Sequence, residues 1–71
     1  MASKKIRSVL AKNIRKYAEE KKMPLNSLAD FAGVSRSQLY DVLNENKSAT
    51  VDWIAKVATA LKVDPSKLLS S

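Results

Sequence analysis

Apolar positions along this chain recur at helical spacing, and polar or helix-breaking residues divide them into five segments. The first segment predicts a helix from Lys5 to about Lys22, because its apolar residues follow one another every three or four positions. Its expected buried stripe consists of Ile6, Leu10, Ile14, Tyr17 and Ala18. Ser3 can cap this helix. Residues 1–4 belong either to the helix or to a flexible arm along a phosphate backbone, and the arm is the favoured interpretation.

Pro24 separates this helix from a second one, because proline disfavours the helical conformation in the residue before it. We expect the second helix at about Leu25 to Ala32. Met23 and Leu28 stand where a hydrophobic staple closes across its start. The residues expected to face inward are Leu28, Ala29 and Ala32. Phe31 does not share that stripe, so it either flanks the core or is exposed.

The next segment predicts a tight turn and a third helix, which together with the second form a helix-turn-helix over residues 28–44. Gly33 suits the left-handed position just after a helix. Ser35, with Gln38 three residues later, is a capping box that opens a helix from about Arg36 to Leu43. The residues expected in the core are Leu39, Val42 and Leu43. The opposite, polar face consists of Ser37, Tyr40, Asp41 and Asn44.

A polar loop then leads to two further helices. Thr50 caps the fourth, and its expected inner stripe is Val51, Ile54, Val57, Ala58 and Leu61, with Trp53 on the flank. Asp64-Pro65 predicts the start of a short last helix, from which Leu68 and Leu69 fold back on the core. The fold class is therefore all-α, with five helices in one domain spanning residues 1–71.

Composition narrows the function. The chain has neither cysteine nor histidine, which excludes disulfides and the usual zinc-finger ligands and removes the commonest general base. It also lacks a glycine-rich phosphate loop, so we expect no enzyme activity, catalytic residue, cofactor or metal. No apolar run approaches the ~20 residues that a membrane span requires, and we expect a cytoplasmic protein.

The net charge of +6 indicates a polyanionic partner. The first 22 residues carry eight lysine or arginine side chains against Glu19 and Glu20, for a net +6, whereas residues 23–50 carry −1 and residues 51–71 carry +1. The basic charge therefore lies on the first helix, while the third helix is weakly charged. We expect the first helix to contribute most of the affinity and the third helix to select sequence.

The polar face of the third helix suits base edges in the major groove of double-stranded DNA. Arg36 can contact guanine in bidentate fashion, Gln38 or Asn44 can meet adenine, and Tyr40 can touch a thymine methyl group or a phosphate. Asp41 must accept from cytosine, pair with Arg36 or lie off the contact, because phosphates repel an unpaired carboxylate. Expected phosphate contacts, which fix register without specificity, are Arg15, Asn26, Lys47 and Ser48.

The segments LADFAGVSRSQL and IAKVATALKVDPSKLL carry a resemblance to the phage-repressor (lambda-repressor-like, or XRE) family of helix-turn-helix domains. The resemblance is ungapped from about Leu10 to Leu69. It implies a five-helix fold, a homodimer on two DNA half-sites and a cytoplasmic transcription regulator. By it, Arg36, Ser37 and Asp41 fall at base-reading positions, and Ser35, Asn44 and Lys47 fall at or near phosphate contacts.

Three departures from the family pattern bear on binding and stability. Pro24-Leu25 replaces a Thr-Gln pair whose glutamine contacts a phosphate. Ala18 and Leu43 replace an arginine and a glutamate that pair in many members, and losing both avoids a stranded buried charge that costs ~3–5 kcal/mol. Glu45 replaces a glycine and adds negative charge near the DNA.

Two functions remain open from sequence. The first is sequence-specific DNA binding as a repressor or controller, for which the family resemblance implies homodimer contacts in the region of the fourth and fifth helices, at Trp53 and residues 68–71. The alternative is a protein-interaction module, such as an antitoxin that binds DNA mainly together with a partner. This alternative rests on apolar residues expected to be exposed, Phe31, Trp53 and Val9, and on the acidic residues near the third helix. Trp53 is assigned either to the core or to an interface.

Overall fold

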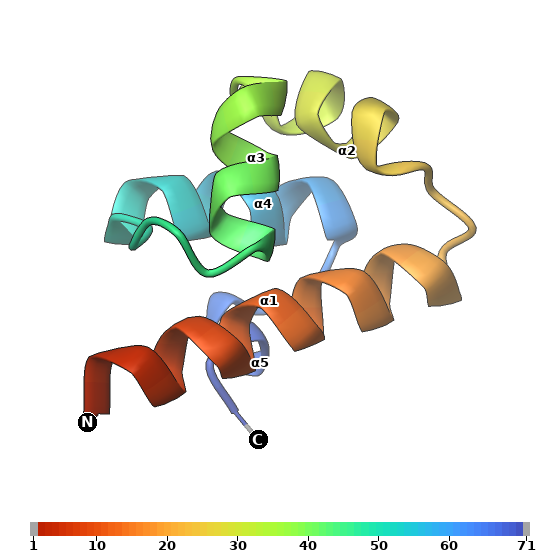
Figure 1. Cartoon of the computed structure of the whole chain (residues 1–71). Coiled ribbons are helices and arrows are strands. Elements are labelled where there is room, and N and C mark those ends of the chain that lie inside the picture. The colour runs from red at the N-terminus through yellow and green to blue at the C-terminus, as the bar shows by residue number, and fades with distance from the viewer. Residues whose placement is uncertain (1, 71) are drawn as a thin grey trace.

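The computed structural model describes residues 2–70, with side chains from residue 6 onward. These residues form five helices: α1 (Ala2–Glu20), α2 (Leu25–Ala32), α3 (Arg36–Leu43), α4 (Val51–Leu61) and α5 (Pro65–Leu68). Helix α1 packs against α3 and α5, while α2 packs against α3 and α4, and α4 also contacts α5 (Figure 1). The all-α fold with five helices and a helix-turn-helix is confirmed.

Helix α1 differs from expectation at both ends. It begins at Ala2, so residues 2–4 are helical rather than an extended arm and Ser3 lies inside the helix instead of capping it; Met1 lies outside the described residues. Alanine and lysine are good helix formers, which accounts for the earlier start. The helix ends at Glu20 because Lys22 adopts a left-handed φ of 53° and the Met23 N–H turns back to the Ala18 carbonyl at 2.8 Å.

The turn between α2 and α3 has the predicted chemistry. Gly33 adopts φ 72° and ψ 33°, and the Val34 N–H donates to the Ala29 carbonyl at 3.0 Å, which closes the end of α2. The Ser35 hydroxyl accepts the Gln38 backbone N–H at 3.3 Å and caps α3, which is one half of the predicted capping box; the described residues show no reciprocal bond between the Gln38 side chain and the Ser35 N–H. The left-handed glycine reverses the chain within three residues, and the serine cap begins the next helix at once.

The buried face of α4 differs from the predicted stripe at two positions, while Ile54, Val57, Ala58 and Leu61 are buried as predicted. Trp53, expected on the flank, is only 4% exposed, whereas Val51, expected in the core, is 83% exposed. Helix α4 packs on both α2 and α5, so its buried arc is wide enough to include Trp53, and Val51 at the first helical position projects beyond it. The Thr50 cap is confirmed, with its hydroxyl accepting the Trp53 N–H at 3.1 Å.

The Asn13 side chain of α1 bonds to the backbone of the C-terminal segment. Asn13 donates from its amide nitrogen to the carbonyls of Lys67, Leu68 and Ser70, at 3.3, 2.9 and 2.7 Å. Leu68 is fully buried as predicted, but Leu69 is 47% exposed and does not fold back on the core. The short helix α5 ends at Leu68, so only one of the two leucines points inward.

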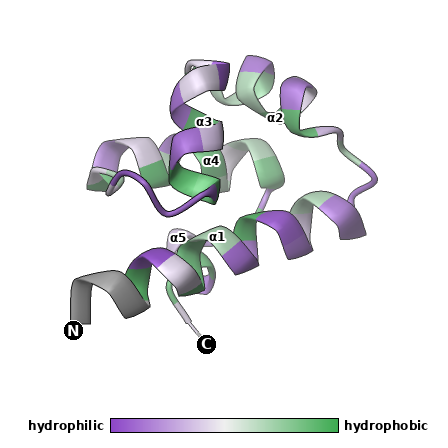
Figure 2. Ribbon diagram, in the orientation of Figure 1, coloured by the Kyte–Doolittle hydropathy of each residue, from purple (hydrophilic) through white to green (hydrophobic). Residues whose placement is uncertain are grey.

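The core draws apolar residues from all five helices (Figure 2). Its fully buried large side chains are Ile14, Leu28, Leu39, Val42, Val57, Leu61 and Leu68. Ala18 and Leu43, which stand where many family members have an ion pair, are also buried, so the apolar replacement is accommodated. Ile6, however, is 54% exposed and does not belong to the buried stripe of α1. In Figure 1 the N-terminal end of α1 extends away from the other helices.

Candidate nucleic-acid interface

Helix α3 presents a polar face that the core holds in place. Leu39, Val42 and Leu43 are buried beneath it, which fixes the rotation of the helix about its axis. Ser37, Tyr40 and Asn44 are exposed on the other side and Asp41 is half-buried, as the helical period requires. Gln38, placed among the base-reading residues from sequence, is also half-buried and lies at the edge of this face.

Arg36 pairs with a residue that the sequence did not indicate as part of the site. Its guanidinium donates from Nη2 to Oδ2 of Asp30 at 3.0 Å, across the turn between α2 and α3. Both side chains are more than half exposed, at 57% and 63%. An ion pair exposed to this extent contributes about 0–1 kcal/mol, so Arg36 can exchange Asp30 for another acceptor at small cost.

Asp41 does not pair with Arg36, which was one of the alternatives that the sequence left open. Its Oδ2 lies 3.5 Å from Nζ of Lys47, in the loop that follows α3. This contact neutralises a carboxylate that would otherwise repel phosphates. It also occupies Lys47, which the sequence assigned to a phosphate. Asp30 and Asp41 therefore each have a cationic partner. Glu45 is exposed and has no ion-pair partner within the described part of the chain.

Tyr40 and Asn26 join the two helices of the motif at the surface. The Tyr40 hydroxyl donates to Oδ1 of Asn26 at 3.0 Å. The contact brings the start of α2 beside the exposed face of α3. A residue predicted to contact phosphate therefore lies next to one predicted to read bases. Arg15 is exposed on α1 and lines a shallow hollow together with Pro24 and Leu25, just before Asn26 in the chain.

The loop after α3 is tied to α1 by a contact that sequence reasoning missed. Nε of Arg7 donates to the Ser48 hydroxyl at 2.8 Å. Glu45, standing where the family has glycine, takes a left-handed φ of 63°, and the Asn46 N–H closes onto the Asp41 carbonyl at 2.9 Å. The loop thus keeps the backbone conformation that glycine favours. Arg7 lies 41 residues from Ser48 in the sequence, and Asp30 lies 6 residues from Arg36. No helical or turn spacing predicts a contact at either separation.

The predicted site residues come from the start of α2, from α3 and its N-cap, from the loop after α3 and, for Arg15, from α1. The Tyr40–Asn26 hydrogen bond and the Asp41–Lys47 ion pair bring four of them together in two pairs. Ser35 is the N-cap residue of α3 and Asn44 its C-cap residue, so these two flank the exposed polar face. A capped, core-anchored helix with an exposed polar face, set after a tight turn, defines a helix-turn-helix domain of the DNA-binding kind.

The comparisons with known proteins agree with this geometry. Residues 13–70 match the Cro/C1-type HTH DNA-binding domain, and the chain belongs to that family. It is a DNA-binding regulator. A search of the curated proteins finds no match.

Three solved structures show the same fold. A hypothetical transcription factor, NHTF, from Neisseria is 31% identical, with a TM-score of 0.88 over 92% of this chain and 75% of that one. The restriction-modification controller protein C.AhdI from Aeromonas hydrophila is 26% identical, with a TM-score of 0.83 over 87% and 94%. An HTH_3 family transcriptional regulator from Vibrio cholerae is 21% identical, with a TM-score of 0.87 over 93% and 37%, and shows the fold alone.

Among residues 2–70 the structure contains neither a candidate metal cluster nor a candidate membrane-spanning helix. No group of three acidic side chains in this part of the chain is placed to hold a metal ion. None of the helices described there is long and apolar enough to cross a membrane.

Proposed function

We propose that the protein binds duplex DNA sequence-specifically as a homodimer and regulates transcription in the cytoplasm as a repressor or controller. The observation that carries this proposal is the exposed polar face of α3, held in register by three buried residues and a serine cap. The similarity to a restriction-modification controller supports the controller type.

Base reading falls to the face of α3, which enters the major groove. Arg36 leaves Asp30 and donates two hydrogen bonds to guanine O6 and N7. Asp41 either accepts from cytosine N4 or stays paired with Lys47. Tyr40 meets a thymine methyl group or a phosphate. Ser37 and Gln38 complete the set, since a short hydroxyl and an amide can each adapt to a base edge.

Phosphate contacts surround this face. We assign them to Arg15, Asn26, Ser35, Asn44, Lys47 and Ser48. Arg7 fixes the position of Ser48 and adds a charge to the same side. Most of the positive charge lies on α1 and the turn after it. The salt-dependent part of the DNA affinity, which comes from counterion release, should therefore depend on the basic residues of α1 more than on α3.

A homodimer explains how so short a helix gains specificity, because two copies of α3 one turn of DNA apart read twice as many bases. The structure changes which residues are available for that interface. Trp53 and Leu68 are buried in the core, so we place the contacts instead on the exposed Val51 and Leu69, from α4 and the end of α5.

The test is selection from a random duplex library, followed by titration of the enriched site and a scrambled duplex. A palindrome with half-sites about one helical turn apart is expected. Arg36→Ala should lose about 1–3 kcal/mol, or roughly 5- to 150-fold, on the enriched site and much less on the scrambled one. Arg15→Ala is the control, with similar losses on both. Equal losses for Arg36→Ala would make it a phosphate contact, and an unenriched pool would refute specific binding.

A further inference from the structure

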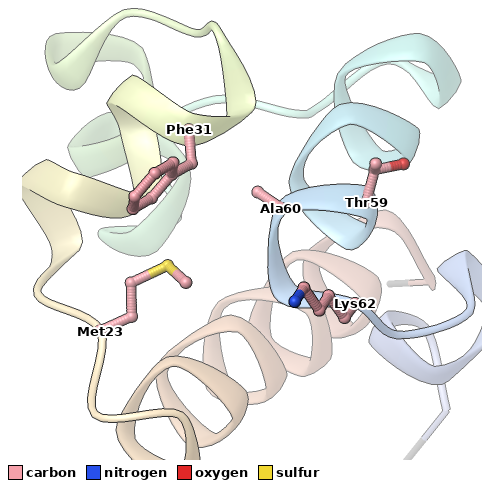
Figure 3. A pocket seen from close by; sticks show the side chains of 5 residues that line it. All are labelled: Met23, Phe31, Thr59, Ala60 and Lys62. Atoms are coloured by element: carbon pink, nitrogen blue, oxygen red, sulfur yellow. The ribbon is translucent and has the colours of Figure 1, made fainter.

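A shallow hollow of about 390 Å³ opens between the C-terminal ends of α2 and α4. Its lining residues are Met23, Phe31, Thr59, Ala60 and Lys62. Figure 3 shows the Met23 side chain below the Phe31 ring, with Ala60 and Lys62 directed toward them from α4 and its end, while the Thr59 side chain points away. Phe31 is 73% exposed, more than any other aromatic side chain described. An aromatic ring at the edge of an apolar hollow is typical of a surface that binds another molecule.

This hollow lies away from the DNA-reading face. On α2, Asn26 and Asp30 contact Tyr40 and Arg36, so that side of the helix faces α3. Phe31 follows Asp30 by one residue and is therefore turned by about 100° around the helix, toward α4. An occupant of the hollow would not compete with α3 for the major groove.

The charge around the hollow indicates the chemistry of the occupant. Lys62 is the charged residue of the lining, and no carboxylate contributes to it among the described residues. Lys62 has no ion-pair partner within 4 Å in that part of the chain. The end of the α4 dipole contributes only about half a negative charge, which the full charge of Lys62 exceeds. A second copy of this chain packed symmetrically on the hollow would bring Lys62 against Lys62, and each copy carries a net charge of +6.

We propose that the Phe31–Lys62 hollow binds an acidic segment of another protein, which inserts an apolar side chain beside Phe31 and Met23 and places a carboxylate against Lys62. An amphipathic helix seated between two helix ends meets both requirements, because its apolar anchors recur on one face and acidic residues can flank them. The interaction does not depend on the base contacts assigned to α3.

The experiment is a selection of 16-residue peptides from a displayed random library against the full chain, with binding of the enriched peptides then measured by fluorescence anisotropy. The expected pool is rich in Asp and Glu around Leu, Phe or Met. Phe31→Ser should weaken these peptides about ten- to one-hundredfold, the loss expected when one aromatic side chain no longer becomes buried. Lys62→Glu should weaken them too, and more at low salt than at high salt.

Ile6→Ser is the matched control, because it removes an exposed apolar side chain from α1, outside the lining of the hollow, and should leave peptide binding unchanged. Both Phe31→Ser and Lys62→Glu alter exposed residues, so thermal unfolding should confirm that each variant folds. The proposal is overturned if no peptides are enriched or if the enriched peptides are basic. It is also overturned if the enriched peptides bind Phe31→Ser with the same affinity as the parent. Sedimentation of Phe31→Ser as a smaller species than the parent also overturns it, since the hollow would then belong to a second copy. DNA affinity of Phe31→Ser should be unchanged, which separates this result from the proposed function.

Discussion

Asp30→Asn tests whether the Arg36–Asp30 pair opposes DNA binding. The substitution removes the acceptor charge 3.0 Å from the Arg36 guanidinium and leaves a side chain of the same shape. Because both side chains are more than half exposed, at 57% and 63%, the pair contributes only about 0–1 kcal/mol to the free protein. The free energy of unfolding should therefore change by less than about 1 kcal/mol.

The effect on DNA is expected to have the opposite sign. If Arg36 must leave Asp30 to reach guanine, then the variant no longer loses that interaction, and binding tightens by up to about fivefold, the equivalent of 1 kcal/mol. The variant also removes a negative charge from a surface that approaches phosphates, so tightening should be larger at low salt.

The assay is anisotropy titration of the enriched duplex and a scrambled one at two salt concentrations, with Asp30→Asn, Arg36→Ala and the double variant. In the double variant the gain on the enriched duplex from Asp30→Asn should shrink to its purely electrostatic part, because the arginine is absent. Weaker binding of Asp30→Asn to the enriched duplex, with Arg36 present, would refute the reasoning and make Asp30 a residue that orients Arg36 for its base.

Three further predictions concern the scaffold. Leu68→Ala should lower the free energy of unfolding, measured with denaturant, by about 2–5 kcal/mol, whereas Leu69→Ala at the exposed neighbouring position should lower it by less than about 1 kcal/mol. Equal losses would contradict the assigned burial of Leu68. Ala18→Arg or Leu43→Glu alone should destabilise the fold by about 3–5 kcal/mol, because each places an unpaired charge in the core. The double variant should be destabilised by less if the two side chains pair, and a double-mutant cycle of thermal unfolding measures the difference. The Ser66 amide and hydroxyl lower the pKa of Asp64 below its usual 3.8, so the ionised Asp64 stabilises the fold above pH 3.8 and this stabilisation is lost as pH falls through the lower pKa of the folded state. The difference in denaturation midpoint between Asp64→Asn and the parent should therefore shrink from pH 6 to pH 2, and a constant difference would contradict this role of Asp64.

Local chemistry made much of the fold predictable. Gly33, Ser35, Thr50 and Asp64 act on backbone groups within a few residues, so their turn and caps follow from sequence alone. The core face of α3 followed for a similar reason, since it depends only on the helical period. The resemblance to the family extended these local signals to a complete arrangement of helices.

Predictions that depended on which neighbour a helix packs against were less successful. Periodicity locates an apolar stripe but not its edges. Because α4 packs against both α2 and α5, Trp53 is buried and Val51 is exposed, the opposite of the expected burial. Ile6 was placed in the core because its spacing is correct, yet that end of α1 extends beyond the helices that would cover it.

The sequence by itself determined the helix-turn-helix, because a left-handed glycine, a serine cap and a helical apolar period are all properties of neighbouring residues. It also placed the basic charge on α1 and the polar face on α3. Only the tertiary structure decided the partners of that face, Asp30 for Arg36, Lys47 for Asp41 and Arg7 for Ser48. Such exposed contacts join separate elements and are weak, so they depend on how the packed helices bring surfaces together and leave no periodic signal in the chain.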